Sequence, residues 1–305
     1  MNNIIPIILS YNQPDEADNI YELLSKYNYM KILVVDNGSD IKKPSRYANF
    51  LIPWNVKAIG QSRIALEYLM TYFKSDYYWL ITTSAFLSNN FNYFNEINES
   101  IKKLMLTGMK VGVFSGGLIG GGNSYGLEFN PDAVDNDYCF VKRIELVSVI
   151  INHDLLKICR KIGAAYFNND FRRGWGCDSE LAYVSMKYNY ACVIDRKIPI
   201  EWKTNIGYKK NVGGEILSEY HRTASLEMLK SLVNKYGYKW ENLFEINYND
   251  YLYKNNIIKD NSVYCSHDKK SNSLIKGIKI LMRYNVLKLS VKKGIITKAI
   301  KHFTF

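Results

Sequence analysis

The amino-acid sequence predicts an α/β fold in which a Rossmann-like, mostly parallel sheet carries helices on both faces. Helix-like segments alternate with short apolar runs, as expected for such a sheet. The runs are continuous rather than alternating, which is typical of strands buried on both faces. Sheets of this kind bind ligands at the carboxyl ends of their strands. The predicted strands of the first half are residues 4–9, 31–35, 50–52, 77–81 and 111–115.

The expected helices follow these strands in order. The first begins near Pro14 and Asp15, because proline and acidic residues suit the first turn of a helix. The 138–151 segment predicts a strand or strand pair in the less regular second half. A C-terminal helical extension follows, and its segment 215–236 has an amphipathic pattern. The other helices are predicted at 62–73, 91–107, 153–162 and 179–188.

Composition limits the class of protein. The chain has 305 residues, of which 47% are hydrophobic and 23% charged, and these values are ordinary for a globular protein. Its five cysteines form no CxxC pair, so neither a zinc site nor a disulfide framework is indicated, and a reducing cytoplasm fits. The N-terminus lacks the features of a signal peptide. No segment approaches the ~18 apolar residues of a membrane span.

Positive charge is concentrated in the last forty residues. Residues 266–305 hold nine lysines and Arg283 against Asp268 alone, so they carry +9 of the net charge of +11 and leave +2 for the body. This pattern predicts a basic amphipathic tail on an anionic membrane surface, and hence a cytoplasmic protein peripheral to the inner face of the membrane. A solvated tail, or a helix docked on the body, is the alternative. No nucleic-acid binding is expected, because the body is nearly neutral.

Several motifs lie where the predicted strands end. SYN (10–12) ends the first strand, and VVDNGSD (34–40) ends the second. AIGQSR (58–63) leads into a helix, and GWGCDSELAY (174–183) and DRKIPIEW (195–202) follow later. In this order and at these separations, the chain resembles the family 2 glycosyltransferases with a GT-A fold, of the bacterial surface-glycan type. The resemblance covers about residues 1–205.

The resemblance implies a nucleotide site at the strand ends. Tyr11, Asn12 and Asp36 match positions that hold the base and ribose of the donor. Gly60 and Arg63 match a segment that passes near the donor pyrophosphate, where a guanidinium pairs well with phosphate oxygens. Two simpler interpretations stay open: Asp36 begins a sequence that also makes a good turn, and Arg63 is a solvated helix residue.

The resemblance also implies a catalytic base. Asp178 matches the carboxylate that, in inverting enzymes, removes the proton of the acceptor hydroxyl. Glu180 is the second candidate for this role. Trp175 lies between two glycines, which suits stacking on a sugar face, and Asp170 and Arg173 are weaker candidates for acceptor binding. The alternative for Asp178 is that it only caps the helix that follows.

The usual metal positions of the family have changed in this chain. Relatives end the strand corresponding to 77–81 in an acidic motif that holds Mn²⁺ or Mg²⁺, and here Thr82, Thr83 and Ser84 stand there. Trp202 stands where relatives often have a metal-binding histidine. Neutral hydroxyls are poor ligands for hard cations. We therefore expect no metal requirement, with Thr83 and Ser84 binding the donor phosphates, although Mn²⁺ or Mg²⁺ remains possible.

Together these features predict four segments: a nucleotide-sugar-binding half (1–115), an acceptor-binding and catalytic half of the same domain (116–205), a helical extension (206–265) and the basic tail (266–305). The expected function is inverting transfer of a sugar from a nucleotide sugar, most simply a UDP-sugar, to a glycan or lipid-linked acceptor in surface polysaccharide or lipooligosaccharide synthesis. The competing function is a catalytically degenerate module that binds a glycan or a protein partner.

Overall fold

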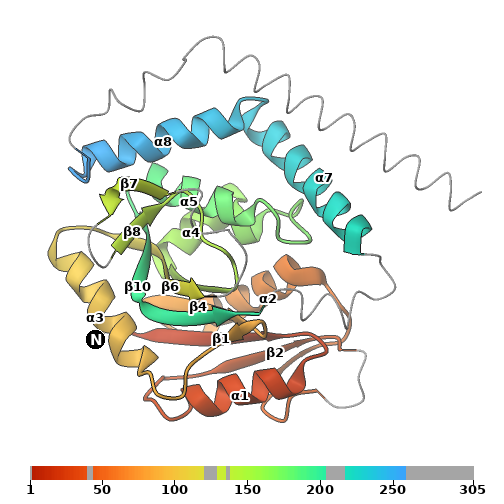
Figure 1. The fold of residues 1–305 in the computed structure, drawn as a ribbon. Helices are drawn as coiled ribbons and strands as arrows, with labels where there is room; N and C mark the ends of the chain where they lie inside the picture. The colour runs from red at the N-terminus through yellow and green to blue at the C-terminus, as the bar shows by residue number, and fades with distance from the viewer. Residues whose placement is uncertain (1, 40–43, 120–128, 135–137, 204–216, 259–305) are drawn as a thin grey trace, which may run out of the picture.

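A computed structural model describes residues 2–39, 44–119, 129–134, 138–203 and 217–258. In these residues one ten-stranded sheet has the order β3-β2-β1-β4-β9-β6-β10-β8-β7, and β5 pairs with β10 (Figure 1). The strands are β1 (Ile4–Ser10), β2 (Leu33–Asn37), β3 (Phe50–Ile52), β4 (Tyr77–Thr82), β5 (Ala85–Phe86), β6 (Val111–Ile119), β7 (Phe129–Val134), β8 (Tyr138–Val141), β9 (Ser148–Asn152) and β10 (Ala191–Trp202).

Helices cover the sheet on both sides, as predicted. Figure 1 shows α1 on one side, and α2, α4 and α5 on the other. Every residue of β1 and β2 is buried, which explains the continuous apolar runs in the sequence. The helices are α1 (Pro14–Leu24), α2 (Lys57–Tyr72), α3 (Tyr93–Leu106), α4 (His153–Ile162), the 3-10 helix η1 (Ala165–Phe167), α5 (Cys177–Lys187), α7 (Leu217–Tyr236) and α8 (Trp240–Lys254).

Parallel pairing in the first half brings the strand ends together. β1 lies between β2 and β4 and is parallel to both, and β2 is parallel to β3. In this register Ser10 pairs with Asp36, and Leu9 pairs with Thr82. The motifs that end the first, second and fourth strands therefore lie at one edge of the sheet, which is the edge where such sheets bind ligands.

The second half of the sheet contains antiparallel pairs that the sequence prediction did not specify. β9 is antiparallel to both β4 and β6, and β10 is antiparallel to β8 but parallel to β6. A continuous apolar run does not distinguish the two arrangements when both faces are covered. The long β10 shifts register between Asp195 and Pro199, and its end pairs Trp202 with Ala85 of β5.

Helix α2 begins at Lys57, five residues before the predicted start at Ser62. The cause is a tertiary contact at the end of β2. The Asn37 side-chain carbonyl accepts from the backbone N–H of Val56 at 3.0 Å, and the Asn37 amide donates to the carbonyl oxygen of Lys57 at 3.5 Å. Local sequence carries no sign of this contact. Gly60 therefore lies within α2 rather than before it, and Arg63 lies within the helix as predicted.

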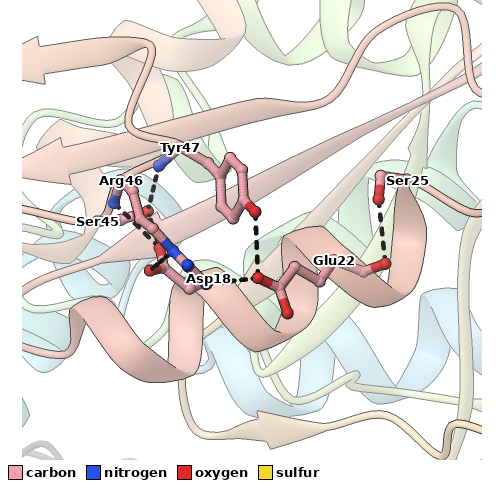
Figure 2. Close-up of polar contacts among 6 residues, drawn as sticks. All are labelled: Asp18, Glu22, Ser25, Ser45, Arg46 and Tyr47. Atoms are coloured by element: carbon pink, nitrogen blue, oxygen red, sulfur yellow. Dashed lines mark hydrogen bonds and ion pairs between the residues drawn. The ribbon is translucent and has the colours of Figure 1, made fainter.

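The segment after β2 is held against α1 by a buried carboxylate (Figure 2). Asp18 accepts hydrogen bonds from the Ser45 hydroxyl at 2.6 Å, from the backbone N–H of Arg46 at 3.1 Å and from Arg46 Nε at 2.9 Å. Glu22, one turn later, accepts from Arg46 Nη2 at 2.5 Å and from the Tyr47 hydroxyl at 3.1 Å. These contacts fix the approach of the chain to β3.

Replacing Asp18 with alanine is expected to lower the free energy of unfolding by about 2–3 kcal/mol, because buried donors lose a charged acceptor. Glu22→Gln is the matched control. It weakens a pair whose side chains are 65% and 46% exposed, and it should cost less than about 1 kcal/mol. Urea unfolding of both variants measures the difference. An equal decrease in the free energy of unfolding of the two variants would show that the buried position of Asp18 adds nothing to stability.

The C-terminal extension contains two helices in the described residues. The predicted helix at 215–236 is confirmed as α7, and α8 follows after a turn at Gly237. The Phe244 ring of α8 stacks on Tyr183 of α5, with ring centroids 4.2 Å apart. No helix in the described part of the chain is long and apolar enough to cross a membrane. The predicted tail at 266–305 lies outside the described residues.

Candidate active site

The predicted nucleotide residues at the ends of β1 and β2 are joined through one serine. The Asp36 carboxylate is 5% exposed and accepts from the backbone N–H of Ser39 at 3.0 Å and from its hydroxyl at 2.6 Å. The Ser39 hydroxyl in turn accepts from the backbone N–H of Asn12 at 2.9 Å. Asn12 has a left-handed backbone, with φ of 54°, and Tyr11 beside it is half-buried. The Asp36 carboxylate thus closes the turn through Ser39. Because carboxylate oxygens can accept further hydrogen bonds, the same group can also be the candidate ligand of a ribose.

Helix α2 fixes the other side of these strand ends. The buried Gln61 amide donates to the carbonyl oxygens of Ser10, at 3.2 Å, and of Val35, at 3.0 Å. Gly60, one residue earlier, has little room for a side chain, because an added Cβ would lie 3.0 Å from the Cβ of Val56. Arg63 donates to the side-chain carbonyl of Asn169, which lies in the second half of the chain.

The contact between Arg63 and Asn169 is part of a longer seam between the two halves of the chain. The backbone N–H of Ile59 donates to the carbonyl oxygen of Arg172 at 3.4 Å, and an added Cβ on Gly174 would lie 3.9 Å from the Ile59 side chain. The loop that precedes GWGCD therefore lies against the first turn of α2. This seam brings the predicted nucleotide and acceptor segments to the same edge of the sheet.

The hydroxyls at the end of β4 bond mainly within the protein. Thr82 Oγ1 lies 2.7 Å from Ser84 Oγ and 3.2 Å from the carbonyl oxygen of Val147, to which it donates. Thr83 is buried. The carbonyl oxygen of Ser84 accepts from the backbone N–H of Lys203 at 3.1 Å. Because Trp202 pairs with Ala85, the two segments in which the resemblance places metal ligands lie side by side.

The GWG turn directs Asp178 into the first turn of α5. Gly174 and Gly176 both have left-handed φ values, +96° and +88°, and Gly176 is the N-cap residue. Asp178 is therefore not the cap, and the alternative that it merely caps the helix is wrong. Its carboxylate is 15% exposed and pairs with Arg143, whose Nε lies 3.4 Å from Oδ2. A carboxylate in the first turn of a helix interacts favourably with the helix dipole.

Glu180 lies in a different environment from Asp178. It is fully buried, and its Oε2 accepts from the backbone N–H of Ala165 at 2.7 Å and from the Asn168 amide at 3.2 Å. Its Oε1 accepts from the Tyr236 hydroxyl at 2.7 Å and lies 2.8 Å from Lys235 Nζ. Burial, together with the negative charge of Glu180, raises the pKa of Tyr236. The carboxylate joins α5, η1 and α7, and its burial and four partners suit a positioning role.

Helix α7 packs against the loop at 168–176, the predicted acceptor segment, and the sequence analysis did not predict this contact. Arg173 binds both carboxylate oxygens of Glu227 through its backbone N–H and its guanidinium. The Trp175 ring is 37% exposed and lies beside His221, with ring centroids 5.3 Å apart. Asp170 is exposed at the edge of the loop. The amphipathic pattern identified α7, but only the fold shows which of its residues meet this loop.

Comparisons with known proteins give structural matches only. No family model and no curated protein matches the sequence. Glucosyl-3-phosphoglycerate synthase from Mycobacterium tuberculosis, in complex with Mn²⁺, UDP-glucose and phosphoglyceric acid, aligns with a TM-score of 0.50 and 11% identity, over 77% of this chain and 79% of that chain. A mannosyltransferase from Pyrobaculum calidifontis, in complex with GDP-Man and Mn²⁺, aligns with a TM-score of 0.49 and 11% identity, over 99% and 87%.

This chain has a GT-A glycosyltransferase fold. The fold class predicted from the sequence is confirmed, and at 11% identity the likeness establishes the fold alone. Membership of family 2 remains an interpretation of the motifs.

The resemblance implies a divalent cation at the end of β4 and beside Trp202. Mn²⁺ and Mg²⁺ prefer carboxylate oxygens. Here Thr82 and Ser84 supply neutral hydroxyls that bond to each other, and Trp202 supplies no metal ligand. In the described ranges, no group of three or more His, Cys, Asp or Glu side chains could hold a metal ion. The residues at these two positions do not fit the cation.

Proposed function

We propose that this protein is an inverting glycosyltransferase that moves a sugar from a nucleotide-sugar donor to a glycan or lipid-linked acceptor without a metal ion. The observation that carries the proposal is the seam between α2 and the loop before GWGCD. Through it, the first turn of α2, which follows the strand ends, contacts the loop that leads to Asp178. In the proposal, a donor bound at the strand ends directs its sugar toward this carboxylate.

In the proposed reaction, Asp178 takes the proton of an acceptor hydroxyl. The acceptor oxygen forms a bond to the anomeric carbon from the side opposite the nucleotide. The bond from that carbon to the diphosphate oxygen breaks, and its electron pair stays on the leaving diphosphate. The configuration at the anomeric carbon is inverted. A positioned base of this kind contributes roughly 10²–10⁴-fold to the rate.

The other residues are assigned supporting roles in the same proposal. Tyr11, Asn12 and Asp36 hold the base and ribose. Arg63 and Gly60 border the path of the pyrophosphate. The hydroxyls of Thr83 and Ser84 donate to phosphate oxygens, and for this Ser84 turns its hydrogen away from Thr82 Oγ1. At the acceptor, Trp175 stacks on a sugar face, with Asp170 and Arg173 at the loop edge, and Glu180 acts only by fixing α5. A UDP-sugar donor and a surface polysaccharide or lipooligosaccharide product follow from the motif resemblance.

A thermal-shift panel with UDP-, GDP-, CMP- and dTDP-sugars tests the donor site. A ligand at 100 times its Kd stabilises the folded state by about 2.7 kcal/mol, which is easily measured. We expect one nucleotide class to raise the melting temperature, and Asp36→Asn to weaken that rise. No shift with any nucleotide sugar would contradict the donor site.

One observation favours a second function. The metal position holds hydroxyls in place of carboxylates, as would be expected of a GT-A fold that lost catalysis and became a glycan- or partner-binding module. Donor hydrolysis separates the two functions, because a module would bind a nucleotide sugar or glycan without releasing a nucleoside diphosphate.

We also propose that the basic tail holds the protein on the inner face of the membrane. Each Lys or Arg near anionic headgroups contributes about 1 kcal/mol, so replacing Lys276, Lys279 and Arg283 with glutamine should weaken binding to anionic vesicles by roughly 100-fold. The matched control replaces Lys102, Lys103 and Lys110 of the body. Sedimentation with phosphatidylserine vesicles measures both full-length variants. Equal sedimentation of the tail variant and wild type would contradict the proposal.

A further inference from the structure

Arg143 lies between the proposed base, Asp178, and a second carboxylate, Glu145. It belongs to the connection between β8 and β9, a segment with no motif in the sequence. Its Nε lies 3.4 Å from Oδ2 of Asp178, and its Nη2 lies 3.8 Å from Oε1 of Glu145. The three side chains are 29%, 15% and 24% exposed, so the guanidinium is partly shielded from water. Screening of the pair is correspondingly weaker than at the surface.

Four other ionisable groups, on α5, η1 and α7, are either neutral or paired with a different cation. Burial raises the pKa of Cys177 and of Tyr166, and the negative charge of Asp178 adds to both shifts, so these groups stay neutral. Glu180 on the same helix is held by its own partners, including Lys235. On α7, Glu227 is paired with Arg173. Arg143 thus supplies a cation directly to the Asp178 carboxylate.

We propose that Arg143 is the positioning residue of the catalytic base: it keeps Asp178 ionised and oriented, while Glu145 fixes the guanidinium. The inference rests on the proposed function. When Asp178 takes the acceptor proton, its carboxylate becomes neutral and the attraction to Arg143 falls, but Glu145 still holds the guanidinium in place. Asp178 then loses this proton to solvent, and its ion pair with Arg143 is restored for the next turnover.

The test is the pH dependence of kcat/KM in the full-length enzyme. An opposite charge within this distance favours the ionised carboxylate by about one pH unit or more. In Arg143→Gln, the acid limb of the profile should therefore move to higher pH by about one unit, with donor affinity unchanged. Arg143→Lys keeps the charge but not the planar guanidinium, so it should keep the limb close to that of wild type while lowering kcat.

Lys142→Gln is the matched control. This substitution removes a cation from the same connection. Lys142 pairs with Glu245 of α8, at 3.2 Å, so the acid limb of the Lys142→Gln profile should not move. An unmoved limb in Arg143→Gln, or the same shift in Lys142→Gln, would overturn the role of Arg143 while leaving the proposed function intact. Absence of turnover in wild type would instead overturn the proposed function. Should Arg143→Gln fail to fold, Glu145→Gln gives the opposite test, because removing the Glu145 charge leaves more positive potential at Asp178 and should move the limb to lower pH.

Discussion

Asp178→Asn is expected to lower turnover roughly 10²–10⁴-fold, because asparagine cannot take the proton of the acceptor hydroxyl. Binding of the nucleotide should be unchanged, since the residues proposed to bind it lie at the strand ends and Asp178 lies on α5. Release of nucleoside diphosphate measures turnover, and isothermal titration measures donor binding.

The chain offers a matched control for this substitution. Asp154 is the second residue of α4, as Asp178 is of α5, and both acids lie in the first turn of their helix. Asp154→Asn therefore removes a comparable helix-dipole contribution, about 0.3–1 kcal/mol. We expect it to leave turnover unchanged. Turnover retained in Asp178→Asn would contradict the assignment of the base.

Turnover of the wild-type protein is expected to survive excess EDTA, and Mn²⁺ should barely change the affinity for the donor. The reason is the chemistry at the end of β4, where neutral hydroxyls and Trp202 stand in the metal positions. The double variant Ser84→Asp with Trp202→His should gain a dependence on Mn²⁺. A metal ion contributes several kcal/mol to charge stabilisation, so Mn²⁺ should tighten its donor binding by about tenfold or more.

The opposite result would be informative about a particular residue. If EDTA abolished turnover in wild type and Mn²⁺ restored it, a carboxylate elsewhere would have to hold the cation. Glu180 is buried and has four partners, which leaves Asp36 at the strand edge as the ligand to test. The proposed metal independence would then be wrong.

The first half of the fold was predictable because its strands are buried on both faces and its helices alternate with them. Continuous apolar runs such as IIPIIL indicate strands that are buried on both faces. Strand direction in the second half was not predictable. The apolar pattern of β9 would be the same whether the strand were parallel or, as observed, antiparallel to β4. The start of α2 was missed because it depends on Asn37, a residue twenty positions earlier in the chain.

The candidate site was predictable only where motifs mark the ends of strands or turns. Asp36 and Asp178 belong to such motifs, and the glycines around Trp175 signal an unusual backbone. Arg143 and Glu227 had no comparable signal, because a charged residue in an unmarked segment is usually solvated. They meet the site through the packing of the β8–β9 connection and of α7, and no local pattern encodes that packing.

The most direct test of the account follows donor consumption by proton NMR in the presence of EDTA, with water or a glycan as acceptor. For an α-linked nucleotide sugar, we predict a β-configured first product: the free β-anomer, before mutarotation, when water is the acceptor, and a β-glycoside when a glycan is the acceptor. This signal should be lost in Asp178→Asn. Release of the α-anomer, or a donor that binds but is never consumed, would contradict metal-independent inverting transfer by Asp178.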